Sequence, residues 1–254
     1  MLNYVEYGKE NKYDDDIFFQ KYSQMSRSQQ GLAGAGEWET LRKLLPDFKD
    51  KRVLDLGCGY GWHCIYAMEH GASSVVGVDI SHKMLEVAKE KTHFPQVEYK
   101  CCAIEDVEFP EESFDVILSS LAFHYVADYE ILVKKIYRIL KSGGKLVFTV
   151  EHPVFTAYGT QDWHYNEKGE ILHFPVDNYY YYEGKRAAVF LGEKVTKYHR
   201  TLTTYLNTLL SNGFIINHIV EPQPPEYMMD IPGMRDEMRR PMMLIVSANK
   251  KVDR

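Results

Sequence analysis

The 254-residue sequence lacks a long hydrophobic run and lacks an excess of positive charge. No stretch of about eighteen apolar residues occurs, and the first residues have neither the basic nor the apolar block of a secretory signal, so we expect a cytoplasmic protein with no membrane partner. Lys and Arg number 30 against 36 Asp and Glu, for a formal charge of −6. With no dense basic tract, this balance argues against nucleic acid as a partner.

Cysteine is also scarce. The four cysteines are Cys58, Cys64, Cys101 and Cys102. They do not form pairs with zinc-type spacing, which argues against a zinc site or a disulfide framework. No triad of carboxylates has the pattern of a magnesium site, so we expect no metal. Aromatic residues are plentiful instead, with 19 tyrosines, four of them consecutive at 179–182.

Short apolar runs alternate with helical patterns through the first part of the chain. The runs span residues 53–56, 75–78, 97–99, 114–118 and 145–150. Several are apolar without alternation, as is typical of strands buried on both faces. A late helix at 202–210 and strands at 214–220 and 242–246 follow. The order predicts an α/β fold with a Rossmann-like, doubly wound, mostly parallel seven-stranded sheet.

The segment 151–200 interrupts this rhythm. Glycines punctuate it at Gly159, Gly169, Gly184 and Gly192, with short aromatic runs between them. We interpret it as an inserted, partly β lid over the domain formed by 51–150 and 201–254. Residues 1–50 are predicted to form a helical cap. Its aromatic residues either fold over a ligand or simply pack a helix, and they are Tyr13, Phe18, Phe19 and Tyr22.

A strand at 53–56 leads into three alternating glycines, Gly57, Gly59 and Gly61, and then into a helix. Glycine lets the chain turn sharply and lets a ligand approach the backbone. In a dinucleotide fingerprint a third glycine or alanine packs the helix on the strand, but Trp62 stands at that position. Asp79 ends the next strand, 20 positions after Gly59. A carboxylate there can accept hydrogen bonds from both ribose hydroxyls of an adenosine.

Four ordered stretches carry a family resemblance. They are Val53-Leu54-Asp55-Leu56-Gly57-Cys58-Gly59-Tyr60-Gly61, Val76-Gly77-Val78-Asp79-Ile80-Ser81, Phe109-Pro110-Glu111-Glu112-Ser113-Phe114-Asp115 and Leu140-Lys141-Ser142-Gly143-Gly144. Over about residues 34–152 the chain resembles class I S-adenosylmethionine-dependent methyltransferases, most closely the small-molecule type-11 group. The resemblance implies S-adenosyl-L-methionine as cofactor, S-adenosyl-L-homocysteine as product, a small-molecule acceptor, and a last strand that runs antiparallel between the fifth and sixth.

The resemblance also implies cofactor-binding positions. At the methionine end it places Asp55 near the amino group, the turn residues Gly57, Cys58 and Gly59 against the methionine part, and the backbone of Ser119 facing it. At the adenosine end it places Asp79 on the ribose and Ile80 and Met84 on the adenine, followed by the stretch Ala103, Ile104 and Glu105. Ala103 stands where many relatives have an Asp that bonds the adenine amino group, so that contact falls to Glu105 or to a backbone carbonyl.

His124 and His152 follow the fourth and fifth strands, at the edge where ligands bind in such sheets. Each is either a catalytic base that accepts a proton near pH 7 or a structural histidine that holds a loop. The pair His199-Arg200 either binds an acidic substrate group or neutralises a loop. If residues 179–182 form a strand, alternate tyrosine rings face an aromatic or amphipathic acceptor.

Two alternatives to a methyltransferase stay open at this point: a nicotinamide-dependent oxidoreductase, and a non-catalytic S-adenosylmethionine-binding partner protein. A homodimer through the inserted segment is also open.

Overall fold

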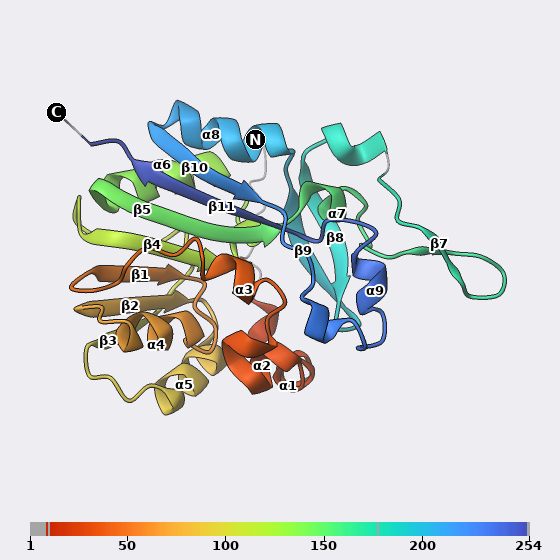
Figure 1. Cartoon of the computed structure of the whole chain (residues 1–254), viewed down its shortest axis with the longest axis horizontal. Helices are drawn as coiled ribbons and strands as arrows, with labels where there is room; N and C mark the ends of the chain where they lie inside the picture. Colours follow the sequence, from red (N-terminus) through yellow and green to blue (C-terminus); the bar gives the residue numbers. More distant parts are fainter. Residues whose placement is uncertain (1–8, 10, 177, 253–254) are drawn as a thin grey trace, which may run out of the picture.

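The computed structural model describes residue 9, residues 11–176 and residues 178–252. Its centre is a seven-stranded sheet in the order β10-β11-β5-β4-β1-β2-β3 (Figure 1). The strands are β1 (Arg52–Leu56), β2 (Ser74–Asp79), β3 (Val97–Cys101), β4 (Phe114–Ser120), β5 (Leu140–Glu151), β10 (Phe214–Val220) and β11 (Met243–Lys250). Pairing from β5 through β3 is parallel, whereas β11 runs antiparallel to both β5 and β10. The predicted sheet and its antiparallel last strand are confirmed.

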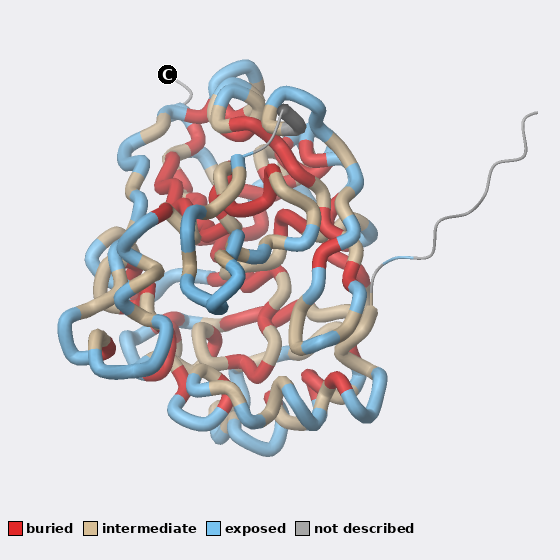
Figure 2. The backbone as a smooth tube through the Cα atoms, turned by 90° about the vertical axis from the view of Figure 1, so that its right-hand side faces the viewer, coloured by how far each residue is buried: buried red, intermediate tan, exposed pale blue. Residues whose placement is uncertain are grey.

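Helices cover both faces of the sheet. One face is covered by three helices, α3 (Trp38–Leu41), α4 (Trp62–Glu69) and α5 (His82–Lys91). The other face is covered by α6 (Tyr129–Ile139) and α8 (Leu202–Ser211). Strand β1 shows why: Leu54 and Leu56 pack in the cluster of α6 and α8, whereas Val53 packs in the cluster of α3 and α4. The buried stretches of the backbone, drawn in red in Figure 2, accordingly lie mostly in the middle of the molecule.

Two boundaries differ from the sequence prediction. Strand β5 begins at Leu140, directly after α6, rather than at Lys145. The extra residues pair because Leu140 lies opposite Phe114, after which the register shifts so that Lys145 lies opposite Val116. Strand β11 reaches Lys250 because it pairs with β5 over nearly its whole length.

The N-terminal segment forms η1 (Lys12–Asp14), α1 (Asp16–Ser23), α2 (Ser26–Gln30) and η2 (Gly31–Gly34). It is fixed to the start of α5, because Oδ1 of Asp14 accepts hydrogen bonds from Ser81 Oγ at 2.6 Å and from the Lys83 backbone N–H at 3.2 Å. On its other side, Phe18 is fully buried against Ala188 and Val195. The segment thus contacts both the sheet domain and the inserted segment.

The inserted segment lies outside the main sheet. It contains α7 (Pro153–Ala157), β6 (His164–Tyr165), β7 (Ile171–His173), η4 (Asn178–Tyr181), β8 (Gly184–Phe190) and β9 (Glu193–His199). Strands β6 and β7 form one antiparallel pair and β8 and β9 another. The hairpin that carries β7 projects away from the body of the molecule (Figure 1). The segment is therefore partly β, as predicted.

The tyrosine run does not form a strand. Its first three residues belong to the 3-10 helix η4, which ends at Tyr181, and Tyr181 and Tyr182 are 84% and 69% exposed. The strand on which the alternation of these rings depended is therefore absent, and neither Tyr181 nor Tyr182 lines the cavity described below. Short glycine-bounded segments have too few backbone partners to become strands unless a neighbouring strand is available.

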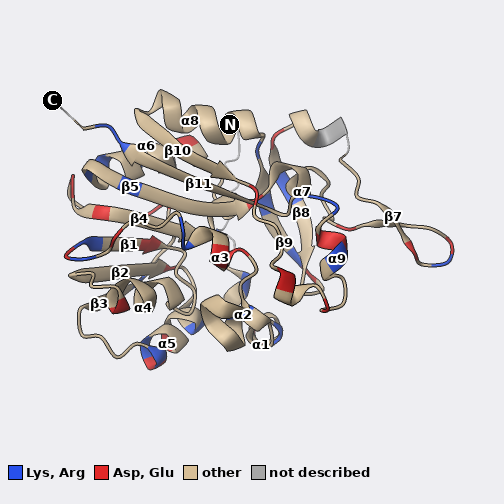
Figure 3. Ribbon diagram, in the orientation of Figure 1, with Lys and Arg blue, Asp and Glu red and all other residues tan. Residues whose placement is uncertain are grey.

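The connection between β10 and β11 contains η5 (Glu226–Met228) and α9 (Met234–Glu237). It is joined to the inserted segment by Arg240, whose guanidinium lies 4.4 to 4.8 Å from the ring centres of Phe155, Trp163 and Phe174. Acidic and basic residues occur on the same helices, as on α5 and α9 (Figure 3). Within the described residues, no helix is long and apolar enough to span a membrane.

Candidate active site

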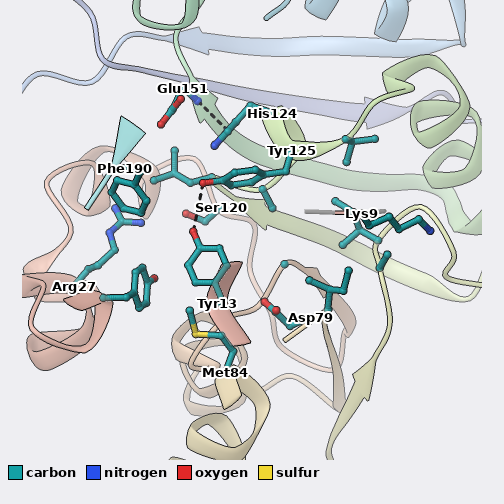
Figure 4. Close-up of a pocket in the computed structure, with 18 of the residues that line it drawn as sticks. Lys9, Tyr13, Arg27, Asp79, Met84, Ser120, His124, Tyr125, Glu151 and Phe190 are labelled. Atoms are coloured by element: carbon teal, nitrogen blue, oxygen red, sulfur yellow. Dashed lines mark hydrogen bonds between the residues drawn. The ribbon is translucent and has the colours of Figure 1, made fainter. Parts of the chain in front are cut away.

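A cavity of about 220 Å³ lies at the carboxyl ends of the parallel strands (Figure 4). Four of these strands each bring a residue to its lining: Gly57 follows β1, Asp79 ends β2, Ser120 ends β4 and Glu151 ends β5. The antiparallel β11 begins at the same edge with Met243. This is the edge at which doubly wound sheets bind ligands.

The turn after β1 has the backbone that its glycines predict. The φ angles of Gly57, Gly59 and Gly61 are +78°, +52° and +75°, in the left-handed region that favours glycine. A Cβ at Gly57 would lie 2.4 Å from the Cβ of Ala122, so the close approach of these two segments also requires glycine. A Cβ at Gly59 would meet no atom within 4 Å, which leaves open space above the turn.

Asp79 is held by two backbone N–H groups. Oδ2 accepts from Gly59 at 2.8 Å and Oδ1 accepts from Ser81 at 2.9 Å. Burial raises the pKa of Asp79, and these hydrogen bonds oppose the increase. Each carboxylate oxygen keeps a further lone pair, so the side chain can still accept two hydrogen bonds from a ligand in the cavity.

Asp55 lies behind the turn rather than in the cavity lining. It is 1% exposed, its Oδ2 accepts a hydrogen bond from Cys64 Sγ at 3.5 Å, and its Oδ1 has no partner. Burial raises its pKa from 3.8 to about 7, and Asp79 adds to the increase. Cys58 is likewise buried beside the turn and outside the lining.

The structure brings the residues predicted to contact the adenosine part of the cofactor together in the cavity lining. Besides Asp79, they are Ile80, Met84, Ala103, Ile104 and Glu105. The side chain of Ser119 is outside the lining, which contains the next residues Ser120, Leu121 and Ala122, and its buried hydroxyl donates to the Leu56 carbonyl at 2.7 Å. The predicted role of the Ser119 backbone stays a prediction. Side chains alternate along β4, so the pleat turns Ser119 away from the cavity.

His124 is in the lining and 2% exposed. Its Nδ1 accepts a hydrogen bond from the backbone N–H of Glu151 at 3.4 Å, and the side chains of His124 and Glu151 lie at the same end of the cavity (Figure 4). Burial lowers the pKa of His124 to about 4, although Glu151 opposes the decrease. The imidazole is therefore neutral near pH 7.

Glu151 is a site residue that sequence reasoning missed. Its Oε1 accepts from Lys197 Nζ at 2.5 Å and its Oε2 accepts from Gln161 at 2.7 Å. Burial favours its protonated form, but His124, Lys197 and the two hydrogen bonds outweigh burial and lower its pKa. The signal was available, because Glu151 directly precedes His152 at the same strand end, but carboxylates are so common on surfaces that position alone did not single it out.

His152 does not line the cavity. Its Nδ1 accepts from the Val154 backbone N–H at 3.0 Å, which caps α7, and its Nε2 lies 2.9 Å from Glu221. Burial lowers its pKa. These contacts match the structural alternative for this residue.

Arg200 is not in the cavity lining either, and its hydrogen bonds are to backbone carbonyls. Its guanidinium donates to the carbonyls of Phe123, Val126 and Ala127 in the segment that carries His124. His199 bonds Thr156 Oγ1 and the Tyr180 carbonyl, each at 2.8 Å. Neither residue of the pair lines the cavity, and both hold neighbouring segments through uncharged hydrogen-bond partners.

Aromatic rings line the remaining walls. Tyr13 and Tyr22 come from the N-terminal segment, Tyr125 from η3 (Phe123–Tyr125) and Phe190 from the end of β8. The hydroxyls of Tyr13 and Tyr125 lie 3.4 Å apart. Sequence reasoning singled out Tyr13 and Tyr22 but missed Tyr125 and Phe190, which had no motif to mark them.

Arg27 of α2 is also in the lining, with its guanidinium paired to Glu37 at 2.6 and 2.9 Å. In the part of the chain that the structure describes, no group of three or more His, Cys, Asp or Glu side chains is placed to hold a metal ion.

Known proteins share this architecture. A model of the methyltransferase domain matches residues 54–148. A crystal structure of an S-adenosylmethionine-dependent methyltransferase from Mesorhizobium loti is 40% identical, with a TM-score of 0.79 over 86% of this chain and 100% of that one. A protein from Listeria monocytogenes assigned to the same class is 56% identical, with a TM-score of 0.83 over 87% of this chain and 99% of that one.

The chain belongs to the class I S-adenosylmethionine-dependent methyltransferases, type 11. A ubiquinone biosynthesis O-methyltransferase from Coxiella burnetii is 36% identical over 112 residues, which are 43% of this chain and 47% of that protein. The similarity to this relative thus spans less than half of either protein.

The residues of this methyltransferase fit its cofactor, S-adenosyl-L-methionine. Asp79 offers free lone pairs to a ribose, and the turn at Gly59 leaves space beside the backbone. The buried Oδ1 of Asp55 has no donor within the described residues, and an amino group would supply one. Trp62 occupies the position where a dinucleotide site has a small residue.

Proposed function

We propose that this methyltransferase acts on a small-molecule acceptor. The observation that carries the proposal is that a single cavity is lined by the cofactor-binding strand ends, by the N-terminal segment and by the inserted segment together. Phe190 of β8 and Tyr13 of the N-terminal segment enclose it from outside the sheet. A large macromolecular surface does not reach a site covered in this way, whereas a small molecule does.

In this proposal the chain divides into three functional parts. Residues 51–150 and 201–254 bind the cofactor, residues 1–50 form a cap, and residues 151–200 form the lid over the acceptor. The name of the Coxiella burnetii relative, which methylates an oxygen in quinone biosynthesis, supports a small acceptor. We expect acceptor specificity to reside in the lid, because Phe190 at the end of β8 lines the same cavity as the strand ends.

The cofactor would supply an activated methyl group on a sulfonium, whose departure leaves a neutral thioether that needs no proton. The protein therefore has to align the acceptor with the methyl group and the sulfur, and it does not have to form covalent bonds itself. Asp79 and the glycine turn hold one partner, and the aromatic walls position the other. Such alignment contributes up to roughly 7–11 kcal/mol to lowering a barrier. The covering residues Tyr13 and Phe190 exclude water, which strengthens the polar contacts inside.

Calorimetry and an acceptor screen test the proposal. We expect S-adenosylmethionine to bind and the nicotinamide cofactors not to bind. In the screen, S-adenosylhomocysteine release is measured with phenols, amines, quinone precursors and hydroxy acids, and with protein and RNA fractions as competing acceptors. Release with a small molecule is the expected result. Release only with a macromolecular fraction would contradict it.

A further inference from the structure

We propose that the acceptor reacts through a neutral hydroxyl group, which is held between the Nε2–H of His124 and the carboxylate of Glu151. The inference rests on the proposed small-molecule function and names the chemical class of its substrate. It assigns His124 a hydrogen-bond donor role in place of the catalytic base predicted from the sequence.

The hydrogen bond that His124 accepts at Nδ1 determines which ring nitrogen can donate to a ligand. Because the backbone N–H of Glu151 donates to Nδ1, the lone pair of Nδ1 is occupied and the proton of the neutral ring resides on Nε2. The ring is in the cavity lining, so Nε2 presents an N–H group toward a ligand. An N–H donor suits an oxygen with a free lone pair, and it does not suit a protonated amine.

Glu151 supplies the hydrogen-bond acceptor for the ligand. Each carboxylate oxygen already accepts one hydrogen bond from the inserted segment, through Lys197 and Gln161, and each can accept another from the cavity side. One donor and one acceptor side by side match a hydroxyl, which both accepts and donates. A carboxylic acid ligand would place its negative charge beside Glu151.

Charge balance separates a hydroxyl from a cationic amine. Lys197 is 2% exposed and pairs with Glu151, so the charges of these two side chains cancel before any acceptor binds. Arg200 lies behind the same wall and adds positive charge. A cationic acceptor would bring an uncompensated charge into a buried site, which is unfavourable. A neutral hydroxyl adds no charge to the site.

The side chains around this polar end indicate what kind of molecule carries the hydroxyl. Tyr125 and Phe190 lie beside this polar end, and Lys197 Nζ is 6.0 and 5.4 Å from their ring centres. Met242 and Met243 complete the wall from β11. Rings and flexible thioethers favour an aromatic or apolar body that carries the hydroxyl.

The reaction balances with these groups. The hydroxyl oxygen forms a bond to the methyl carbon while the carbon–sulfur bond breaks and its electron pair stays on sulfur. The hydroxyl proton passes to Glu151 and then to solvent, giving a methyl ether. The oxygen becomes strongly acidic as its new bond forms, so a carboxylate with a lowered pKa suffices to take the proton.

A matched acceptor series provides the first test. Phenols, anilines, benzylamines and benzoates with identical ring substituents are compared by S-adenosylhomocysteine release. We expect the phenols to have the highest kcat/KM, by about tenfold or more over each analogue that lacks the hydroxyl. A preference for amines or carboxylates would overturn the hydroxyl assignment and leave the small-molecule function intact. Failure of S-adenosylmethionine to bind in calorimetry would instead overturn the proposed function itself.

Variants of the two residues provide the second test. E151Q keeps the shape but removes the charge, and we expect kcat/KM for the phenol to fall about tenfold or more while cofactor affinity stays within about twofold. His124→Gln retains an N–H near Nε2 and should keep more activity than His124→Phe. The exposed Glu69 at the end of α4, outside the cavity lining, provides the control, because E69Q should match wild type. Equal activity of E151Q and wild type would overturn the proposal.

A spectroscopic measurement stays decisive even if E151Q folds poorly, because it uses the wild-type protein. Nitrogen-15 NMR of the His124 imidazole should show a protonated, pyrrole-type Nε2 and a pyridine-type Nδ1 at about pH 7. Addition of the best phenol should shift the Nε2–H resonance more than the Nδ1 resonance. A protonated Nδ1, or an imidazolium, would overturn the donor role.

Discussion

The free energy of unfolding should depend on pH through Asp55. The carboxyl group is buried, has one weak thiol donor and no cationic partner among the described residues, and its pKa rises from 3.8 to about 7 on folding. A raised pKa in the folded state means that the folded protein binds the proton more tightly than the unfolded chain. The stabilisation that Asp55 contributes is therefore complete below its unfolded pKa and is lost as pH rises through about 7.

The magnitude follows from the two pKa values. Between about pH 5 and about pH 8, linkage gives a loss of about 2.5 kcal/mol from this one group. Asp55→Asn removes the titration and keeps the shape. Its buried amide lacks an acceptor, which costs about 1–3 kcal/mol at every pH, so the absolute stability of the variant is a poor readout. The difference in pH dependence between variant and wild type isolates Asp55, since all other groups titrate in both.

Urea unfolding of both proteins at about pH 5 and about pH 8 measures this difference. We expect the stability of D55N relative to wild type to improve by about 2.5 kcal/mol as the pH rises over that interval. Parallel pH dependence of the two proteins would refute the reasoning, because Asp55 would then titrate alike in both states. Saturating S-adenosylmethionine should shrink the difference, since a cationic amino group near Asp55 would lower its folded pKa.

Three further predictions concern the turn and the segment that carries His124. Gly57→Ala should lose about 2–4 kcal/mol of stability because its Cβ would clash with Ala122, whereas Gly59→Ala should lose only about 1–2 and, if folded, bind the cofactor at least tenfold more weakly by calorimetry. Arg200→Met should speed amide hydrogen exchange across residues 121–127 about tenfold or more, and unchanged exchange would contradict the carbonyl contacts. His124 has a folded pKa of about 4, so it binds fewer protons folded than unfolded. In urea unfolding, the stability of wild type relative to His124→Gln should therefore fall by about 2.5 kcal/mol as pH drops from 6.5 to 4, and parallel pH dependence of the two proteins would contradict this.

The sheet was predictable because its strands are buried on both faces. Apolar runs such as 53–56 and 114–118 have few alternatives once helical patterns separate them, and the structure places both as central neighbours. Ends of elements were harder. Strand β5 starts at Leu140 because a partner residue, Phe114, is available, and pairing partners are not visible in local sequence.

The inserted segment shows the same limit more strongly. Its glycines and aromatic residues marked it as irregular, but the conformation of the tyrosine run depends on neighbours that are distant in sequence. The His199 imidazole, for example, bonds the carbonyl of Tyr180 at 2.8 Å. A tertiary contact of this kind overrides the strand preference of tyrosine.

For the site, motif positions were predicted and compensating positions were not. Asp79 and the glycines are fixed by the turn that the backbone must make, so spacing reveals them. Glu151 acquires its role from Lys197, which is 46 residues further along the chain. Sequence shows two common charged residues, and only the fold shows that they neutralise each other beside His124.

The two ends of the cavity differ in charge, and this difference suits methyl transfer. At the cofactor end, Asp79 lines the cavity and Asp55 lies behind the glycine turn. Neither has a cationic side-chain partner among the described residues, and burial raises the pKa of both. At the acceptor end, Glu151 is paired with Lys197. A sulfonium cofactor with an amino group brings net positive charge, so it would compensate the buried aspartates and would leave the Glu151–Lys197 pair unchanged for the proposed neutral acceptor. The reaction removes the sulfonium charge, so the product loses part of this attraction to the two aspartates, and release follows from the same electrostatics that favour binding.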